Sequence, residues 1–543
     1  MKKSTKLLSF IVAVVLVIGT FAACGGKEET ATTNNKFTYW GTLDSSVAQT
    51  QTSYADLLMY QEMMKRTGIE VEFIHPAQGT TGTEAFQILM SSGDYPDMVE
   101  YSWANYTGGP DQAISDGVII SLNDYLEEYA PNYYNYMEGE GGKARNYTYK
   151  ATAISNGGNY YGFKSLNVGN YRGYAGFYVR ADLLKKWGLE VPETIDDWEL
   201  VFKTAKENGI KYPLTGGKGL IGAMSSNYLM SAWKVGTSFY LEGNTVKFGP
   251  FEPAFKDYVQ KMTDWMKAGY IDIDYITNDT TTIHGQITNG TSIATTGYVG
   301  GDLGAIIPAM AERDPEFDIV ACPYPVMNKG EIPIFQAVQA DATDPCIAIT
   351  VQCGEDDETR YTEAMKWCDY LYSDEGIVLK SFGVEGDTFT IEKLEDGEDH
   401  YIYTDKVNNY EEFGASNMSA ALYHFMLPAN HPGFNQHPDY FNGYYPHERQ
   451  KEAIERWNEH VDEAVKHVFP DVSYTGEEAA EKANIEAAAK DNLQAGISNI
   501  ILGKTPMSEY ETIIETAKNA GYGRLLEINQ AAYDRYAKVI GLK

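Results

Sequence analysis

Residues 86–99 read FQILMSSGDYPDMV and contain the pattern that decides the fold. A helix predicted over 83–92 ends at Gly93, because glycine readily adopts the left-handed conformation that closes a helix. Pro96 cannot continue a helix and fixes the start of the next segment, 97–101, which we predict to be a strand. The stretch therefore predicts a helix that stops abruptly and passes into a β-strand.

The same alternation of strands and helices extends in both directions along the chain. Before this stretch we predict a strand over 37–40, a helix over 53–66 and a strand over 69–74. The alternation restarts from Tyr178, and roughly the last hundred residues are mostly helical. Strands that alternate with helices of this length are typical of a parallel sheet covered by helices. We therefore predict an α/β protein with two lobes and a helical C-terminal region.

The chain is long enough for two or three domains with substantial cores. We expect it to cross between the two lobes more than once. The predicted division gives 36–160 and about 331–400 to an N-lobe, and about 161–330 and about 401–543 to a C-lobe.

The N-terminal residues predict export. A lysine-containing start precedes an apolar run over 7–18, which ends at small residues. The run is too short for a stable membrane span but is typical of a secretory signal. We predict a signal peptide over 1–23 and, because its residues are polar and rich in Gly and Thr, a flexible tether over 24–35.

Residues 21–24, FAAC, resemble the lipobox of bacterial lipoproteins, whose cysteine is diacylated and becomes the mature N-terminus. The sequence departs from that pattern at Phe21, where leucine is usual. The resemblance implies that a lipid on Cys24 is the only membrane attachment, on the extracytoplasmic face of the cell membrane. The alternative is an ordinary secreted protein in which Cys24 is incidental.

Charge and composition indicate which classes of partner the protein can bind. The formal net charge is −33 at pH 7, so phosphate groups would repel the protein, and we expect no nucleic-acid partner and no adhesion to anionic lipid. The chain contains 41 tyrosines, and each ring offers an apolar face with a hydroxyl at its rim. This composition suits polar ligands with apolar faces, although many of the rings will belong to the core.

Sequence signatures of catalysis are absent. The chain has no GxSxG, no HExxH, no phosphate-binding loop and no dinucleotide fingerprint. We therefore predict no enzyme activity, no cofactor and no metal site, although the many acidic residues leave a glycosidase carboxylate pair open. The four cysteines after Cys24 could form two disulfides, but buried free thiols are favoured; they are Cys322, Cys346, Cys353 and Cys368.

Two tryptophans follow predicted strands. In open parallel sheets, ligands bind beyond the carboxyl ends of the strands. Trp40 closes the first strand, and Trp103 lies two residues after the strand that ends at Tyr101. Either ring could belong to the core, but their shared position makes both candidate ligand contacts.

Five blocks of the sequence resemble one family. They are FQILMSSGDYPDMV with AISDGVIISLNDYLEEYAPNY, then YVRADLLKKWGLEVPETIDDWE, VKFGPFEPAFKDYVQKMTDWMKAGYID, WCDYLYSDEGIVLKSFGVEG and AAYDRY. These blocks are similar to extracellular solute-binding proteins of bacterial ABC importers, specifically the family 1 oligosaccharide-binding lipoproteins of Gram-positive bacteria. The resemblance runs from about residue 37 to about residue 536. It implies a periplasmic-binding-protein-like clam-shell, whose two α/β lobes are joined by hinge segments and close over a ligand.

The resemblance also implies ligand-binding positions. Tyr298 follows a Thr-Gly step, where sugar binders of the family often carry an aromatic platform, and we expect it to face Trp103 across the cleft. Two further positions, Arg172 and His424, rest only on the aromatic residues around them. The complete set of candidates is Trp40, Asp44, Trp103, Asn105, Asn156, Tyr161, Arg172, Tyr298 and His424. A sugar presents C–H faces to aromatic rings and hydroxyls to Asp, Asn and Arg, but each residue could instead belong to the scaffold.

The leading hypothesis is a monomeric, lipid-anchored protein that binds a small carbohydrate and delivers it to the permease of an ABC transporter. Two alternatives remain open. One is a secreted enzyme that degrades polysaccharides, and the other is a partner that presents a ligand to a membrane sensor kinase.

Overall fold

The computed structural model describes residues 36–542, apart from 78, 142–148, 169–170, 225–227 and 395–396. The predicted signal peptide, the tether and Cys24 lie outside the described residues. None of the helices that the structure describes is both long enough and apolar enough to span a membrane.

The larger sheet has six strands in the order β13-β4-β10-β3-β1-β2. In chain order they are β1 (Lys36–Trp40), β2 (Glu70–Ile74), β3 (Met98–Tyr101), β4 (Phe163–Asn167), β10 (Ala342–Ile349) and β13 (Gly433–Asn435). β1 is parallel to β2 and β3, as predicted. β10 is antiparallel to both β3 and β4, so this sheet is mixed rather than parallel. The chain reaches β10 from the second sheet instead of through a strand–helix–strand crossover, and the local alternation of elements does not reveal that return.

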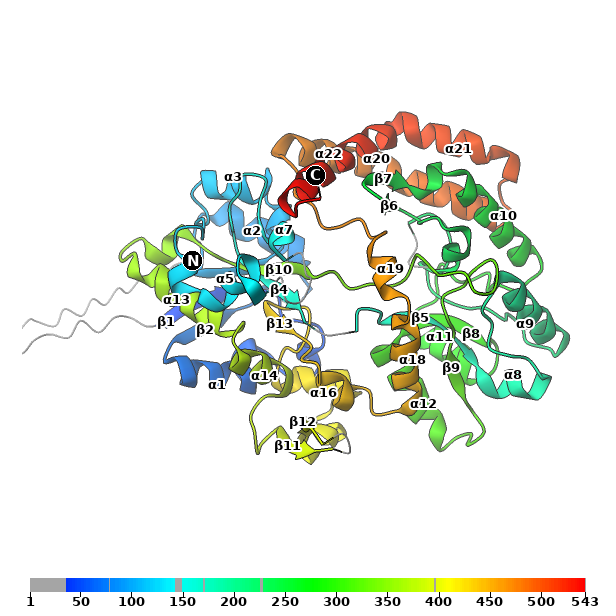
Figure 1. Cartoon of the computed structure of the whole chain (residues 1–543), viewed down its shortest axis with the longest axis horizontal. Helices are drawn as coiled ribbons and strands as arrows, with labels where there is room; N and C mark the ends of the chain where they lie inside the picture. The colour runs from blue at the N-terminus through cyan, green and yellow to red at the C-terminus, as the bar shows by residue number, and fades with distance from the viewer. Residues whose placement is uncertain are drawn as a thin grey trace, which may run out of the picture. The chain divides into compact units, whose positions relative to one another are not determined.

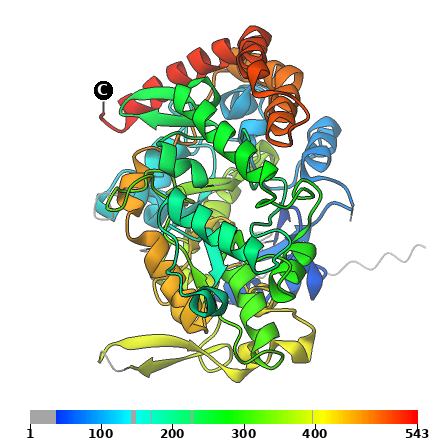
Figure 2. The ribbon, with the colours of Figure 1, turned by 90° about the vertical axis from the view of Figure 1, so that its right-hand side faces the viewer.

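The smaller sheet is antiparallel, with the strand order β8-β5-β9. Its strands are β5 (Ala175–Arg180), β8 (Ala294–Tyr298) and β9 (Ile319–Ala321), and two separate hairpins pair β6 (Phe239–Glu242) with β7 (Thr245–Phe248) and β11 (Phe389–Lys393) with β12 (Asp399–Tyr403). Figure 2 shows the β11–β12 hairpin standing apart from both sheets. The prediction of parallel strands is therefore wrong for the second lobe.

The helices surround the two sheets (Figure 1). The first half of the chain contains α1 (Leu58–Thr67), α2 (Gly82–Ser92), α3 (Gly109–Ser115), α4 (Leu126–Tyr129), α5 (Pro131–Met137), α7 (Tyr149–Ala153), α8 (Ala181–Trp187), α9 (Ile195–Glu207) and α10 (Pro253–Lys267). The second half contains α11 (Thr280–Thr288), α12 (Gly304–Ala311), α13 (Thr359–Tyr370), α14 (Asp374–Phe382), α15 (Asp405–Asn408), α16 (Met418–Phe425), α17 (Tyr440–Tyr444), α18 (Glu448–Asn458), α19 (Val461–Val465), α20 (Gly476–Ile501), α21 (Tyr510–Ala517) and α22 (Gly523–Val539).

Local chemistry explains where the decisive helix α2 begins and ends. The Thr81 side chain accepts a hydrogen bond from the backbone N–H of Glu84 at its N-terminus. Gly93 closes the helix with a φ of 70°, in the left-handed region that glycine tolerates. The helix and the following strand β3 are therefore confirmed.

The chain passes between the two sheets three times. It leaves the larger sheet after β4 and enters the smaller sheet at β5, returns from β9 to β10, and leaves again after β13 toward α18. Gly173 in the first crossing forms a β-bridge with Val338 in the second. The predicted boundary near residue 160 precedes β4, whereas the chain leaves the larger sheet only after Asn167. The lobe limits as a whole stay a prediction.

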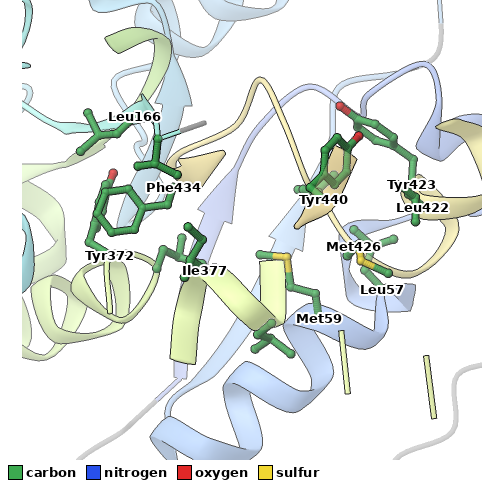
Figure 3. Packing of buried hydrophobic residues seen from close by; sticks show 14 of the residues in the cluster. Leu57, Met59, Leu166, Tyr372, Ile377, Leu422, Tyr423, Met426, Phe434 and Tyr440 are labelled. Carbon is green, nitrogen blue, oxygen red and sulfur yellow. The ribbon is translucent and has the colours of Figure 1, made fainter. Parts of the chain in front are cut away.

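The core at the larger sheet combines segments that are far apart in sequence. Figure 3 shows Leu166 of β4, Phe434 of β13, Ile377 of α14 and Tyr372, which precedes α14, gathered on one side of that sheet. Each of these side chains is almost fully buried, and burial of a large apolar side chain stabilises the fold by about 1.5–3 kcal/mol. A second core, which includes Trp198 of α9, packs at the smaller sheet.

The cysteines after Cys24 are buried free thiols, as favoured from the sequence. Burial raises the pKa of the thiols of Cys322, Cys346, Cys353 and Cys368. They behave as small apolar side chains of the core.

Candidate functional site

The site begins at the carboxyl end of β3. Tyr101, the last residue of β3, pairs with Cys346 of β10, and Cys346 also pairs with Lys164 of β4. Three adjacent strands therefore bring Ser102, Lys164 and Asp344 to one edge of the sheet. The Lys164 Nζ lies 2.5 Å from Asp344 Oδ1, and the Ser102 Oγ donates a hydrogen bond of 2.7 Å to Asp344 Oδ2.

The Lys164–Asp344 pair is charged. Burial opposes the charge on Lys164, but the attraction of Asp344 outweighs it and raises the pKa of Lys164 well above its ordinary value. Burial likewise opposes ionisation of Asp344, and Lys164 nevertheless lowers the pKa of that carboxyl. Both partners are occupied by each other, because a buried ion pair is stable only when both charges are compensated.

A cavity of about 620 Å³ opens at this edge. One wall comes from the larger sheet and its neighbours, with residues from 102–111, 152–164 and 342–344. The opposite wall comes from the start of β6, the segment 469–474, the N-terminal half of α20 and Asn529 of α22. A volume of this size is typical of small-molecule sites.

The opposite wall is rich in polar contacts. The Tyr474 phenol donates a hydrogen bond of 2.7 Å to Asn529 Oδ1. Lys482 of α20 lies 2.9 Å from Glu486 Oε2 and 5.5 Å from the centre of the Tyr474 ring. Tyr474 is therefore held in place from both sides and presents a fixed ring to the cavity.

Asp471 lies on the same wall but, unlike Tyr474 and Lys482, has a side chain that is not engaged by the described part of the protein. Its side chain is solvent-accessible within the cavity, and among the described residues none donates a hydrogen bond to its carboxylate. Desolvation by the surrounding walls raises the pKa of Asp471, Lys164 opposes the shift, and Asp344 adds to it. Asp471 is therefore an acceptor that is available to a ligand.

A second cavity, of about 1310 Å³, adjoins the first. The two share lining residues, including Gly108, Tyr474 and Lys482. The second cavity continues between α2 and α3 on one side and α20 on the other, with Phe86 and Tyr106 in its wall. Together the two cavities offer room for a ligand of several rings.

Three of the sequence-predicted residues line these cavities. Asn156 and Tyr161 line the first cavity, and Asn105 lines the second. The Asn156 Oδ1 accepts a hydrogen bond of 3.1 Å from the Arg535 Nε, whereas its buried Nδ2 has no partner among the described residues. The Tyr161 ring lies 5.0 Å from the Lys164 Nζ, within cation–π distance.

The two tryptophans do not reach the cavities. Trp103 is completely buried, packs edge-on against Phe86 with a centroid distance of 5.3 Å, and donates a hydrogen bond to the Val99 carbonyl. Trp40 is 5% exposed and packs against Phe86 and Tyr101. The expectation that Trp103 faces Tyr298 across a cleft is therefore wrong, because the chain turns at the end of β3 and directs the indole into the core below α2.

Tyr298 lies at the end of β8 in the smaller sheet. It is 58% exposed and stacks on Tyr174 with a centroid distance of 5.8 Å and an angle of 6° between the rings. Its backbone N–H donates a hydrogen bond of 2.6 Å to Asp302 Oδ2, and Asp302 Oδ1 lies 2.6 Å from His284 Nε2. The ring is therefore a fixed, accessible aromatic surface, although it does not line either cavity.

Asp44 belongs to a buried charge network that the sequence did not reveal. Its Oδ2 lies 3.6 Å from His431 Nε2, and the His431 Nδ1 lies 2.8 Å from Glu100 Oε1. The Tyr39 phenol donates a hydrogen bond to the same Glu100 carboxylate. Burial opposes the charge on His431, but Glu100 and Asp44 raise its pKa to about 9. Asp44 is thus engaged within the protein.

The other two candidates are also engaged elsewhere. Arg172 forms an ion pair of 2.6 Å with Asp341, within the two crossings that run side by side. His424 stacks on Phe413 with a centroid distance of 4.3 Å, and its ring lies within hydrogen-bond distance of the Gln51 side-chain amide. Neither lines the two cavities.

Three residues of the cavity wall were not predicted from the sequence; they are Lys164, Asp344 and Asp471. These residues lie in segments separated by more than a hundred positions, and only the pairing of β4 with β10 and the return of the C-terminal segment bring them together. Nothing in the local sequence around any of them marks it as a site residue.

Comparison with known proteins identifies the class. Residues 48–377 match the family described as bacterial extracellular solute-binding protein, and the chain belongs to this family. A relative is the fructooligosaccharide ABC transporter substrate-binding protein FusA of Streptococcus pneumoniae, with 26% identity over 308 residues. That match spans 51% of this chain and 54% of the relative, so the chain spans about half the length of the curated relative.

Solved structures show the same fold. FusA of S. pneumoniae in complex with kestose has a TM-score of 0.70 at 17% identity, with 93% of this chain and 99% of that chain covered. An extracellular solute-binding protein of Bifidobacterium longum subsp. infantis has a TM-score of 0.70 at 16% identity, with 92% and 98% covered. The alginate-binding protein AlgQ2 without calcium ion has a TM-score of 0.69 at 20% identity, with 92% and 98% covered. The predicted periplasmic-binding-protein-like α/β fold is therefore confirmed.

Proposed function

We propose that this protein binds a carbohydrate outside the cell and delivers it to the permease of an ABC transporter. The proposal rests on the cavity at the carboxyl end of β3, which is lined by both aromatic and polar side chains. Membership of the extracellular solute-binding family agrees with a ligand-binding role for this cavity. The fructooligosaccharide transporter protein among its relatives supports a sugar as the ligand.

The chemistry of the cavity suits a sugar. Tyr161, Tyr474, Phe239 and Phe469 line it, and aromatic rings can cover the C–H face of a pyranose or furanose. Among the polar groups, the Asp471 carboxylate can accept hydrogen bonds from sugar hydroxyls. A saccharide presents both surfaces at once, whereas a purely apolar ligand would leave these polar groups without partners.

The proposal includes location and partners. The lipobox-like residues around Cys24 support a lipid anchor on the extracytoplasmic face of the membrane, and we infer that the protein acts as a monomer without catalysing a reaction. Detergent partitioning tests the anchor. The natural protein should enter the detergent phase and Cys24→Ala should remain in the aqueous phase, and a natural protein that stays in the aqueous phase would contradict the anchor.

Binding is tested on the purified mature protein with a panel of mono- and oligosaccharides. A saccharide that binds only the folded state raises the melting temperature by mass action, and calorimetry on each hit gives the affinity. Chromatography of the same mixtures tests for catalysis. Shortened saccharides would indicate a degrading enzyme, and a panel without any shift or heat would overturn carbohydrate binding.

A further inference from the structure

The charges in the cavity wall bear on which saccharide can bind. The first cavity is lined by two lysines, Lys164 and Lys482, and by four carboxylates, which are Asp111, Asp344, Asp471 and Glu486. The wall therefore carries an excess of negative charge. Which of these groups is available to a ligand depends on the contacts that each already makes.

Both lysines are neutralised by carboxylates of the protein. Lys164 lies 2.5 Å from Asp344, and Lys482 lies 2.9 Å from Glu486. A ligand carboxylate could use either lysine only by separating it from its partner. In the described lining of this cavity, no other lysine or arginine is present, so an acidic ligand would find no free cation.

Asp111 is also occupied. It accepts hydrogen bonds from the Gly157 N–H at 2.7 Å, from the Asn159 Nδ2 at 2.9 Å and from the Ser155 hydroxyl. These bonds fix the loop that carries Asn156 toward the cavity. Asp471 remains as the carboxylate without a hydrogen-bond donor among the described residues.

We propose that this cavity selects saccharides without acidic groups, with Asp471 as the specificity-determining residue. The Asp471 carboxylate accepts hydrogen bonds from two hydroxyls of a neutral sugar and repels a uronate. The inference rests on the proposed function, because it concerns the ligand of the same site. Rejection of a competitor by an unfavourable charge contact is a common source of specificity.

The residues that line the adjoining cavity also carry an excess of negative charge. Its lining contains Lys482 as the only described lysine, together with Asp116, Glu477 and Glu486. Asp116 already accepts hydrogen bonds from the Tyr106 phenol and the Gln112 side chain. A longer ligand that extends into this cavity therefore meets no free cation there either.

The test compares matched ligands. The neutral oligosaccharide that binds best in the panel is oxidised at C6 of its hexose units to give the corresponding uronate, and calorimetry at low salt measures both dissociation constants. The natural protein should bind the uronate at least about 100-fold more weakly, because like charges in a partly desolvated site repel strongly. In Asp471→Asn the ratio should fall below about tenfold, because the amide has no charge.

A control separates this effect from the general acidity of the protein. Asp196 is exposed at the start of α9 and lies outside both cavities, so Asp196→Asn removes the same charge elsewhere and should leave the ratio unchanged. Equal binding of the two ligands by the natural protein, or an unchanged ratio in a folded Asp471→Asn, would overturn the inference and leave carbohydrate binding intact. A failure of every saccharide to bind would instead overturn the proposed function.

Discussion

The two sheets end in different kinds of surface. At the carboxyl end of β3 the aromatic side chain, Trp103, is buried and the polar groups Lys164 and Asp344 face the cavity. At the end of β8 the aromatic side chain, Tyr298, is exposed and stacks on Tyr174. An aromatic residue near the end of a strand thus belongs to the core in one sheet, where α2 packs on it, and is an accessible ring in the other.

The largest effect is expected from truncation of Trp103, which tests whether this ring belongs to the core, in contrast to the exposed Tyr298. Trp103→Ala should reduce the free energy of unfolding by about 3–5 kcal/mol, because it empties a fully packed space beside Phe86. Denaturant unfolding measures this loss. Whatever remains folded should keep its saccharide affinity within about threefold. A stable variant with lost affinity would mean that Trp103 contacts the ligand after all.

Breaking the ion pair at the same edge should have the next largest effect. Lys164→Met leaves the Asp344 carboxylate without its cation, which typically costs about 3 kcal/mol. Lys164→Met combined with Asp344→Leu should recover most of this stability, because it removes both charges. Chemical denaturation of the three proteins provides the comparison, and equal losses in the single and double variants would show that packing rather than charge is responsible.

Two buried groups near Glu100, His431 and Lys380, contribute to stability with opposite dependence on pH. His431 faces Glu100 and Asp44, and its pKa in the folded protein is raised to about 9. Because the pKa of His431 is higher in the folded protein, its protonation increases the free energy of unfolding. This contribution is fully present below the unfolded pKa of about 6.5 and is lost as pH rises through about 9. Lys380 is completely buried and has a pKa lowered by burial to about 7, with Glu100 opposing the shift. Above about pH 7, Lys380 binds fewer protons in the folded protein than in the unfolded protein. Its contribution to the free energy of unfolding therefore becomes more favourable as pH rises above about 7.

These two groups should nearly cancel in the natural protein between pH 7 and pH 9. His431→Gln should then become more stable over this range by about 2 kcal/mol, and Lys380→Met should become less stable by about 2 kcal/mol, at 1.36 kcal/mol for each pH unit and proton. Denaturant midpoints at several pH values measure both slopes. Slopes of the same sign in the two variants would contradict this account.

The sequence was sufficient for the elements but not for the site. The Gly93 and Pro96 signals correctly located α2 and β3, because helix ends depend on local backbone chemistry. The antiparallel β10 and the Lys164–Asp344 pair depend on contacts across about 180 positions, which no local pattern encodes. Of the predicted ligand residues, Asn156 and Tyr161 reach the first cavity. Trp103 follows β3, as expected of a ligand contact, but α2 and α3 cover it, and that packing is not visible in the local sequence.

The smallest expected effect on stability belongs to Tyr298, and it decides whether the smaller sheet contributes to binding. Because the ring is 58% exposed, Tyr298→Ala should change the free energy of unfolding by less than about 1 kcal/mol. If the ring covers a sugar in the ligand-bound protein, its loss should weaken binding about tenfold, which corresponds to about 1.4 kcal/mol. Tyr298→Phe is the matched control, since it keeps the apolar face and loses only the hydroxyl, and it should bind nearly as well as the natural protein. Calorimetry with the same saccharide distinguishes the outcomes. Unchanged affinity in Tyr298→Ala would restrict binding to the cavity at the larger sheet, and an equal loss in both variants would assign the contact to the hydroxyl instead of the ring.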